Sequence, residues 1–498
     1  MKNNKNYMYQ YDVCIIGSGA VGLYIANKLC NENLKVSIVD IGGDNLSKKI
    51  YYDFESIFVS DKYHGALEGR NFGLGGSTQS WGGVLIPYSK YDCKKTDKNY
   101  NTWCFIDEII KENSNEVLSK LKINNQNNFF LKKLTSQDNN TFNNNFVYGY
   151  SKTLPPNKRN FGTLFFNKKI DFFKNSFVNE WFINDNELHS VQLKSCISNN
   201  LKIIKSKIFI VCAGAIESTR ILLEINQSEK NKVFNENSDL GYYLGDHISC
   251  KLLDLEYSQT IINEFSPKFY KDIISTVRMI NKDQDDKLPR FFIHIIFDIK
   301  DQTFQILKNI YKNIQMRNYY KAIDFRIFKH SLILYKYIYY RYFKKKLYIP
   351  KNTKIKLQID FEQEPSKDNY IKLSDDIDSN GRNKSMINWK ITKRDRENLK
   401  NIIGFINSSF KKDSLLTNID VPNNFNSYNF YDSYHPVGTC SMGADEKNVV
   451  NNDLKVRNIS NLYSLSSAIF PSAGSSNPTF SLLCFANNLS NNLIKIFK

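Results

Sequence analysis

A glycine-rich turn near the start of the chain constrains the fold more than any other feature of the sequence. The letters GSGAVG, residues 17–22, follow directly on the apolar run Tyr11–Ile16 and precede a stretch with helical spacing of apolar residues. A second β-rich run, Lys35–Val39, ends at Asp40, which lies 23 residues after Gly17. This order of strand, glycine turn, helix, strand and acid is typical of a dinucleotide-binding βαβ unit.

Each residue of this unit has a physical role in holding a diphosphate. Gly17 permits the tight turn, Gly19 lets the backbone approach a pyrophosphate, and Gly22 allows the helix to pack closely on the strand. The N-terminus of the helix offers free N–H groups and the positive end of the helix dipole. Asp40 is expected to accept hydrogen bonds from ribose hydroxyls and to repel a 2′-phosphate, which disfavours NADP. The motif does not separate NAD from FAD.

Length and composition narrow the class of protein further. A chain of 498 residues suggests two or three domains, and an aromatic content of 14% argues against disorder. The net charge of +18 favours an anionic partner such as phosphate, nucleic acid or a membrane surface, although a codon bias toward Lys and Asn explains the same excess. Nine scattered cysteines without a C-x-x-C pair argue against disulfides and zinc, so no metal is expected. With no signal peptide and no apolar run of about 20 residues, we expect a cytoplasmic protein.

Several later segments resemble one enzyme family, and they follow one another in the order that this family has. They are GLGGSTQSWGG at residues 73–83, IVCAGAIESTRILL at 210–223, LGDHI at 244–248, YHPVGTCSMG at 434–443 and NLYSLSSAIFPSAGSSNPT at 461–479. Together they resemble the signatures of the glucose–methanol–choline (GMC) oxidoreductases, which are FAD-dependent. The resemblance extends from residue 11 to residue 494 and is poor over 89–160 and 253–424, as expected of substrate-facing regions.

The resemblance implies an α/β fold with two domains. A Rossmann-type FAD-binding domain is expected from the discontinuous segments 1–88, 161–252 and 425–498. An α+β substrate-binding or cap domain with an antiparallel sheet is expected from 89–160 and 253–424. The sequence pattern agrees, because the apolar run Ile208–Ala215 predicts a strand buried on both faces.

The resemblance also assigns residues to the cofactor. Beside the first glycine motif and Asp40, the residues expected to contact FAD are Gly75, Gly76, Ser77, Trp81, Ala213, Ser466 and Pro478. Ser466 departs from the family pattern, in which Gly or Asp is more frequent near the FAD phosphates, although a hydroxyl can still donate a hydrogen bond. For Trp81, a plain core position is the equal alternative. Ser80 stands where some relatives tether FAD through a histidine, so we expect FAD to be bound non-covalently.

Two residues match the family's catalytic positions. His435, in H-P-V-G-T, occupies the place of the base, and Asn477, in S-S-N-P-T, occupies the partner position, which is His or Asn among relatives. Oxidation of an alcohol removes a hydroxyl proton, which histidine is suited to accept, and a hydride, which flavin N5 accepts. An asparagine amide can stabilise a developing alkoxide. The structural alternatives are a loop histidine and an asparagine that serves turn geometry before Pro478.

These residues predict an FAD-dependent dehydrogenase or oxidase that acts on the CH–OH group of a small alcohol, with a sugar or polyol as the expected substrate. One alternative is an NAD-dependent Rossmann dehydrogenase, and another is a non-catalytic, membrane-associated flavoprotein.

Two further features give less specific predictions. Glu217 and Arg220 are spaced to pair across one helical turn, as a brace or as a plain surface pair, and His247 is expected to support the FAD domain.

A basic, aromatic segment lies within the second predicted domain. Residues 305–348 contain eleven Lys and Arg against one acid, a net charge of +10. Five bulky side chains recur there at helical spacing: Phe328, Leu332, Tyr335, Tyr339 and Tyr342. Basic and aromatic residues on one helix are typical of peripheral contact with a membrane, here the inner face of the cell membrane. The alternative is a helix that buries this stripe in its own domain. Nucleic-acid binding is not expected, because no recognised module accompanies the charge.

Overall fold

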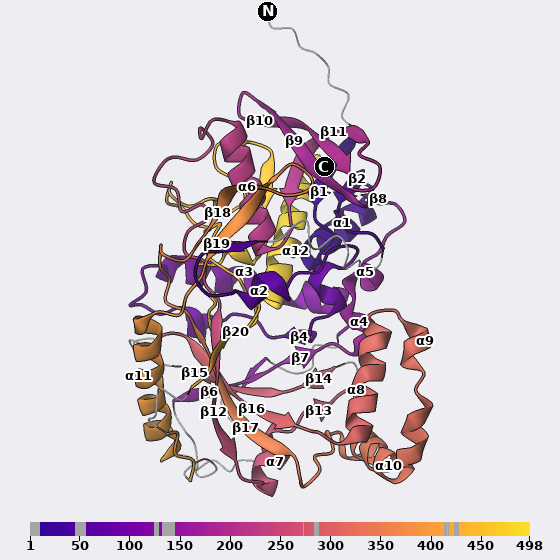
Figure 1. Ribbon diagram of the computed structural model, residues 1–498, viewed down its shortest axis with the longest axis vertical. Helices are drawn as coiled ribbons and strands as arrows, with labels where there is room; N and C mark the ends of the chain where they lie inside the picture. The colour runs from indigo at the N-terminus through magenta and orange to yellow at the C-terminus, as the bar shows by residue number, and fades with distance from the viewer. Residues whose placement is uncertain are drawn as a thin grey trace, which may run out of the picture.

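The chain forms two sheet-centred halves, which lie one above the other in Figure 1. The computed structural model describes residues 10–44, 56–123, 129–131, 145–271, 273–282, 288–412, 416, 418–422 and 428–498. The upper half is built on a mostly parallel sheet with helices packed against it, and the lower half is built on an antiparallel sheet with helices at its sides. The fold is therefore mixed α/β, as the sequence predicts.

Parallel strands from distant parts of the chain form the core of the first sheet. In spatial order they are β8 (Asp171–Phe173), β2 (Val36–Val39), β1 (Tyr11–Ile16), β11 (Leu201–Val211) and β21 (Leu462–Ser464). The antiparallel hairpin of β9 (Ser176–Asn184) and β10 (Glu187–Ser195) extends the sheet from the other end of β11. Segments near both ends of the chain therefore meet in one sheet.

The predicted βαβ unit is present at the centre of this sheet. The last four residues of β1 and all of β2 are buried, which explains their continuous apolar runs. Helix α1 (Ala20–Asn31) begins directly after Gly19 and packs against α12 (Pro478–Phe497), which also contacts α3 (Tyr100–Lys120). The start of α12, where Asn477 lies, is thereby fixed relative to the glycine turn.

All strand pairs of the second sheet are antiparallel. Its order is β20 (Phe430–Asp432), β12 (His247–Leu255), β17 (Lys354–Glu362), β16 (Phe291–Asp298), β15 (Val277–Asn281), β6 (Phe146–Tyr150) and β5 (Phe130–Leu131). One detail differs from the predicted division of the chain. The sequence predicts residues 161–252 and 425–498, and with them most of β12 and all of β20, in the first domain, but hydrogen bonds between β12 and both β17 and β20 place these strands in this sheet.

Apolar and polar residues alternate along these strands, so the sheet has a core face and a polar face. Ile293 and Ile359 pack in the core with α11 (Lys393–Phe410), whose apolar residues recur at helical spacing. Arg278, His294 and Asp360, at even-numbered positions, lie on the opposite face and line a cavity. The pleat of the sheet therefore points these polar side chains toward the first half of the molecule.

Shorter elements complete the fold around the two sheets. The strands are β4 (Val84–Leu85), β7 (Lys152–Thr153), β13 (Lys268–Phe269) and β14 (Ile274–Ser275) in one sheet, and β3 (Ile57–Phe58), β18 (Tyr370–Ile377) and β19 (Asn383–Asn388) in another. The helices are α2 (His64–Leu67), α4 (Pro156–Arg159), α5 (Phe161–Leu164), α6 (Ala215–Ser228) and α7 (Gln259–Phe265).

A helical arm stands at one side of the lower half (Figure 1). It consists of α8 (Gln302–Gln315), α9 (Tyr319–Ala322), a 3₁₀ turn (Phe325–His330), α10 (Ser331–Tyr339) and a π turn (Tyr340–Lys344). Four of the five side chains of the predicted stripe are exposed, namely Phe328, Leu332, Tyr335 and Tyr342. The alternative in which the domain buries this stripe is therefore wrong. Within the described parts of the chain, no helix is both long and apolar enough to span a bilayer.

Candidate active site

A cavity of about 540 Å³ opens at the carboxyl ends of β1 and β2. Residues from the glycine turn, the 69–84 loop, the β11–α6 junction and the start of α12 line it, and we call it the first cavity. Nine of the predicted cofactor residues lie on its wall: Gly17, Gly19, Asp40, Gly76, Ser77, Trp81, Ala213, Ser466 and Pro478. Gly22 and Gly75 do not line this cavity.

The glycines of the first motif have three different environments. A Cβ on Gly17, whose φ is +108°, would lie 2.5 Å from the carbonyl oxygen of Cys212, so the turn abuts the end of β11. A Cβ on Gly22 would overlap the carbonyl oxygen of Gly17, which is the close packing of helix on turn that the motif predicts. A Cβ on Gly19 would contact nothing within 4 Å. Gly19 therefore presents its backbone directly to the cavity.

Asp40 has a structural role that its sequence position does not reveal. Its Oδ2 accepts hydrogen bonds from the backbone N–H and the hydroxyl of Ser18, both at 2.8 Å. Its Oδ1 accepts from the N–H groups of Gly42 at 2.8 Å and Gly73 at 2.9 Å. A carboxylate offers about four lone-pair sites, so these donors use its acceptor capacity and tie three loops together. The ribose contact of Asp40 stays a prediction, and it requires one of these bonds to be shared.

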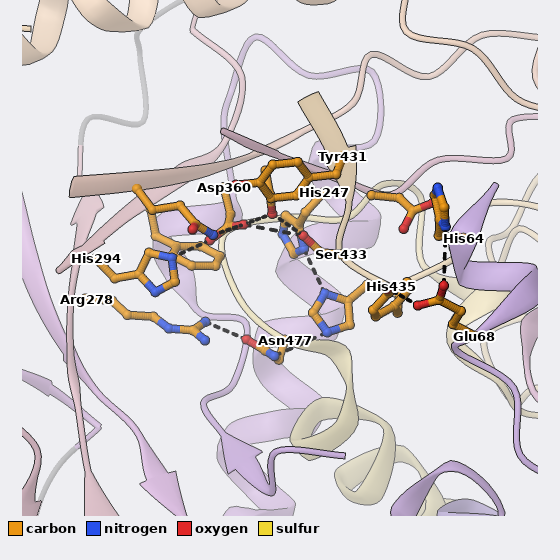
Figure 2. Close-up of a pocket in the computed structure, with 15 residues that line it drawn as sticks. His64, Glu68, His247, Arg278, His294, Asp360, Tyr431, Ser433, His435 and Asn477 are labelled. Carbon is orange, nitrogen blue, oxygen red and sulfur yellow. Dashed lines mark hydrogen bonds and ion pairs between the residues drawn. The ribbon is translucent and has the colours of Figure 1, made fainter. Parts of the chain in front are cut away.

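A second cavity of about 580 Å³ lies on the polar face of the second sheet. His435 and Asn477 line both cavities and so stand at the junction between them. His435 lies in the loop that follows β20, and Asn477 is the residue before the first turn of α12. Figure 2 shows the two side chains turned toward each other, with Nε2 of His435 3.2 Å from Nδ2 of Asn477.

A continuous series of hydrogen bonds fixes the tautomer of His435. Nε2–H of His247 donates to the carbonyl oxygen of Gly474 at 2.9 Å, because a carbonyl can only accept. Nδ1 of His247 is then an acceptor, and it receives Nδ1–H of His435 at 3.2 Å. Nε2 of His435 therefore carries a lone pair rather than a proton, and that lone pair is directed at the junction of the cavities.

The same series fixes the amide of Asn477. Nη1 of Arg278 donates to its Oδ1 at 2.5 Å, so Nδ2–H is left to point at His435 (Figure 2). Asn477 makes no side-chain capping bond to α12. This geometry disfavours the alternative in which Asn477 serves turn geometry before Pro478.

The electrostatic environment keeps the imidazole neutral. Burial, followed by the neighbouring His247 and Arg278, lowers the pKa of His435 to about 3. Burial also lowers the pKa of His247 and lowers that of Arg278 to about 10, so Arg278 stays cationic at neutral pH. An unprotonated Nε2 beside a fixed amide N–H can accept a proton from a hydroxyl while the amide stabilises the oxygen.

Asp246 fixes the backbone of the loop that contains His435. Its carboxyl oxygens accept hydrogen bonds from the hydroxyl of Tyr63 at 2.5 Å and from the backbone N–H groups of His247 at 2.6 Å and His435 at 3.0 Å. Burial raises the pKa of this carboxyl to about 8, against the effect of the Tyr63 bond. Asp246, His247 and His435 bring potential metal ligands within 4.8 Å of one another. Both imidazoles already bind protein groups through both nitrogens, so we assign no metal here.

The pair Glu217–Arg220 is part of a buried network rather than a surface pair. Arg220 and Arg382 both bind Glu217, at 2.6 and 3.2 Å, and Arg70 binds it at 3.2 Å. Glu224 joins the same two arginines. This network braces α6 against the 69–84 loop and β19, beside the first cavity.

Sequence reasoning missed most of the second cavity. Arg278, His294 and Asp360 come from the region that matches the family poorly, and no motif marks them. His247 was noted in LGDHI but assigned to structural support, whereas its ring contacts His435 directly. Cross-strand pairing brings these residues together, and that pairing has no short-range sequence signal.

Known proteins resemble this chain in part of its sequence and in its fold. The family model described as GMC oxidoreductase matches residues 365–486. Pyridoxine 4-oxidase from Mesorbium loti is similar in structure, with a TM-score of 0.58, 13% identity, and coverage of 97% of this chain and 99% of that chain. A formate oxidase is similar with a TM-score of 0.55, 13% identity and coverage of 98% of both chains. No curated protein matches the chain in sequence.

At this level of identity the structural likeness shows the fold. A mutant formate oxidase of Aspergillus oryzae RIB40, described for its effect on FAD modification, has the same fold with a TM-score of 0.55, 14% identity and coverage of 98% of each chain. GMC oxidoreductases use FAD. The family model spans the segment that contains both His435 and Asn477, so residues 365–486 of this chain match the GMC oxidoreductase family, and the fold of two oxidases is shared along nearly the whole chain.

Proposed function

We propose that this protein is a cytoplasmic flavoenzyme that binds FAD non-covalently in the first cavity and oxidises a CH–OH group held in the second. The observation that carries the proposal is the position of His435 and Asn477, which line both cavities. A base and an amide donor at this junction can act on a hydroxyl whose carbon faces the first cavity.

The residues of the first cavity fit FAD. Gly19 exposes its backbone, and the first turn of α1 has no side-chain cap, so its N–H groups are free for a diphosphate. Ser80 also lines the cavity, and its hydroxyl accepts a hydrogen bond from Asn71 at 2.7 Å. A serine hydroxyl has no imidazole nitrogen with which to tether a flavin, which supports non-covalent binding.

The chain's own residues supply positioning and proton transfer. FAD, when bound, supplies the hydride acceptor. Nε2 of His435 accepts the hydroxyl proton, and Nδ2–H of Asn477 donates to the oxygen that becomes negative. A substrate hydroxyl inserted between these two atoms replaces their direct bond of 3.2 Å. Arg278 and His247 hold the amide and the imidazole in the required orientation.

The polar wall of the second cavity supports a hydroxyl-bearing substrate such as a sugar or polyol. Ser249, Gln358 and Ser433 line it beside His294 and Asp360. The test is anaerobic mixing of the purified yellow protein with a panel of sugars, polyols and simple alcohols, followed by the absorbance of the flavin. Bleaching supports the proposal, and reoxidation by oxygen would assign an oxidase rather than a dehydrogenase. A colourless protein that binds NAD would favour the NAD-dependent alternative.

Replacing Gly19 by Val is expected to remove most of the bound flavin without unfolding the protein. The φ of Gly19 is −75°, which L residues adopt freely, and a side chain there would enter only the first cavity. Flavin content per mole of protein and the far-UV circular dichroism measure the two effects.

The matched control is Gly404→Val on the exposed side of α11, where a Cβ also contacts nothing. The control should retain its flavin. Full flavin content in Gly19→Val would contradict the assignment of the first cavity.

A further inference from the structure

The second cavity contains a buried cation that has no carboxylate partner among the residues that the structure describes. Arg278 on β15 is 7% exposed and lines the cavity. Its guanidinium binds Asn477 and lies 4.2 Å from the ring centroid of Phe292. Among the described residues it forms no ion pair, and the nearby Asp360 is already bound by Nε2 of His294 at 2.8 Å and by Ser249.

A buried cation is stable when a counterion or a full set of hydrogen bonds surrounds it. The guanidinium has five N–H donors in a fork that matches a carboxylate, and the bond to Asn477 uses one of them. We propose that the substrate is an alcohol that carries a carboxylate, and that Arg278 binds this group while His435 faces the hydroxyl. This proposal about the substrate rests on the proposed function.

Paired probes that differ only in charge test this substrate class. They are glycolate against glycolamide, and 4-hydroxymethylbenzoate against its amide, with kcat/KM measured by anaerobic flavin reduction. We expect the wild-type protein to prefer the acids. Arg278→Met should lower kcat/KM for the acids by about 10²-fold and reduce their advantage over the amides, and Arg278→Lys should restore part of it. The flavin absorbance shift on titration with unreactive benzoate should weaken in parallel.

The outcomes separate the two proposals. The carboxylate assignment would be overturned if the wild-type protein oxidised the amides as well as the acids or better. It would also be overturned if Arg278→Met lowered kcat/KM equally for the acid and the amide of a pair, which would leave Arg278 a role in stabilising the alkoxide. Bleaching by neutral alcohols alone would overturn it while the proposed function stands. No bleaching by any alcohol would count against the proposed function itself.

A second, independent observation concerns the helical arm, residues 302–346. It carries eleven of the 24 large apolar side chains that are exposed among the described residues. The six most exposed of them are between 66 and 93% exposed, namely Tyr320, Phe325, Phe328, Leu332, Tyr335 and Phe343. Scattered single apolar residues are normal on a protein surface, but a concentration of this kind marks an interaction site.

The arm is also strongly basic and is fixed to the body of the protein. Its eleven cations against Asp324 give the net charge of +10. At one end, Nε2 of the buried Gln315 donates to the carbonyl oxygens of Thr78 and Trp81, in the loop that lines the first cavity. At the other end, the N–H of Phe269 donates to the carbonyl oxygen of Lys345 at 2.8 Å. The exposed surface is therefore presented by a helical unit tied at both ends.

We infer that the helical arm docks on an anionic membrane. Aromatic side chains settle at the level of lipid headgroups, and Lys and Arg attract anionic lipid. The charge complementarity of +10 with an anionic bilayer selects this partner. Docking would hold the protein at the membrane surface through the arm alone.

Co-sedimentation with vesicles tests the inference on the full-length protein. Binding is expected to vesicles of phosphatidylcholine with 30% phosphatidylglycerol, on the order of tenfold tighter than to phosphatidylcholine alone. Joint replacement of Tyr320, Phe325, Leu332 and Phe343 by Ser should abolish it, and Lys344→Glu with Lys345→Glu should weaken it. The control is Ile197→Ser with Ile377→Ser, two exposed apolar residues elsewhere.

All variants should keep their flavin, since none of these side chains lines the first cavity. Absence of wild-type binding, equal binding to neutral vesicles, or unchanged binding of the arm variants would overturn the inference. A dimer that the arm variants abolish, without vesicle binding, would identify the arm as a contact between two copies of the chain instead.

Discussion

His435→Gln is expected to retain FAD and to reduce it with substrate about 10²- to 10⁴-fold more slowly than the wild-type protein. General-base catalysis contributes a factor of this size. A glutamine amide can occupy the site and bind Asn477, but it cannot accept a proton at neutral pH. Stopped-flow absorbance of the flavin under anaerobic conditions measures the rate, and the flavin spectrum before mixing shows that the cofactor is bound.

The pH dependence gives this prediction a second readout. A base acts only when unprotonated, so activity is lost as the pH falls through its pKa. Because burial, His247 and Arg278 lower the pKa of His435 to about 3, the wild-type rate should not fall with an ordinary histidine pKa near 6.5. The control is His330→Gln on the arm, which should be as fast as the wild type. Rapid flavin reduction by His435→Gln would contradict the assignment of the base.

Asn477→Ala is expected to lower kcat by about 10²- to 10³-fold, the usual effect of removing one donor to a developing oxyanion. The change should fall on kcat more than on KM, because the alkoxide exists in the transition state rather than in the bound substrate. Asn477→His, which restores a ring N–H donor, should recover part of the rate. Anaerobic flavin reduction over a range of substrate concentrations separates kcat from KM.

Thermal stability is the control for a purely structural role. Asn477 makes no capping bond to α12, so its truncation should not loosen the start of that helix through a lost cap. It does leave Arg278 and Nε2 of His435 without their partner. A large fall in the melting temperature with an unchanged kcat in the folded fraction would indicate that Asn477 serves the fold and not the reaction.

The sequence predicted local structure best where the feature is formed by the backbone rather than by side chains. The βαβ unit could be read from residues 11–40 because buried parallel strands require continuous apolar runs and a tight turn requires glycine. The close packing of Gly22 follows from the same spacing and is present. Asp40 shows the limit, since its position predicts a ribose contact and does not reveal the three loops that its carboxylate joins.

The stripe on the helical arm shows a different limit. The spacing of Phe328, Leu332, Tyr335, Tyr339 and Tyr342 is the same whether these side chains face a core or face water. Periodicity gives the side of a helix that a residue occupies, but not what lies opposite that side. The tertiary arrangement decided the question by leaving four of these five side chains exposed.

The sequence by itself determined the mixed α/β class, the glycine turn and the residue types His435 and Asn477, because these depend on short-range spacing and on motifs. Only the tertiary structure decided that a histidine from the loop after β20, an asparagine before α12 and an arginine from β15 belong to one series of hydrogen bonds. These residues are far apart in the chain, and their meeting depends on strand register and helix packing. The direction of these hydrogen bonds and the pKa of His435 follow from this arrangement, so neither can be predicted from any one segment of the sequence.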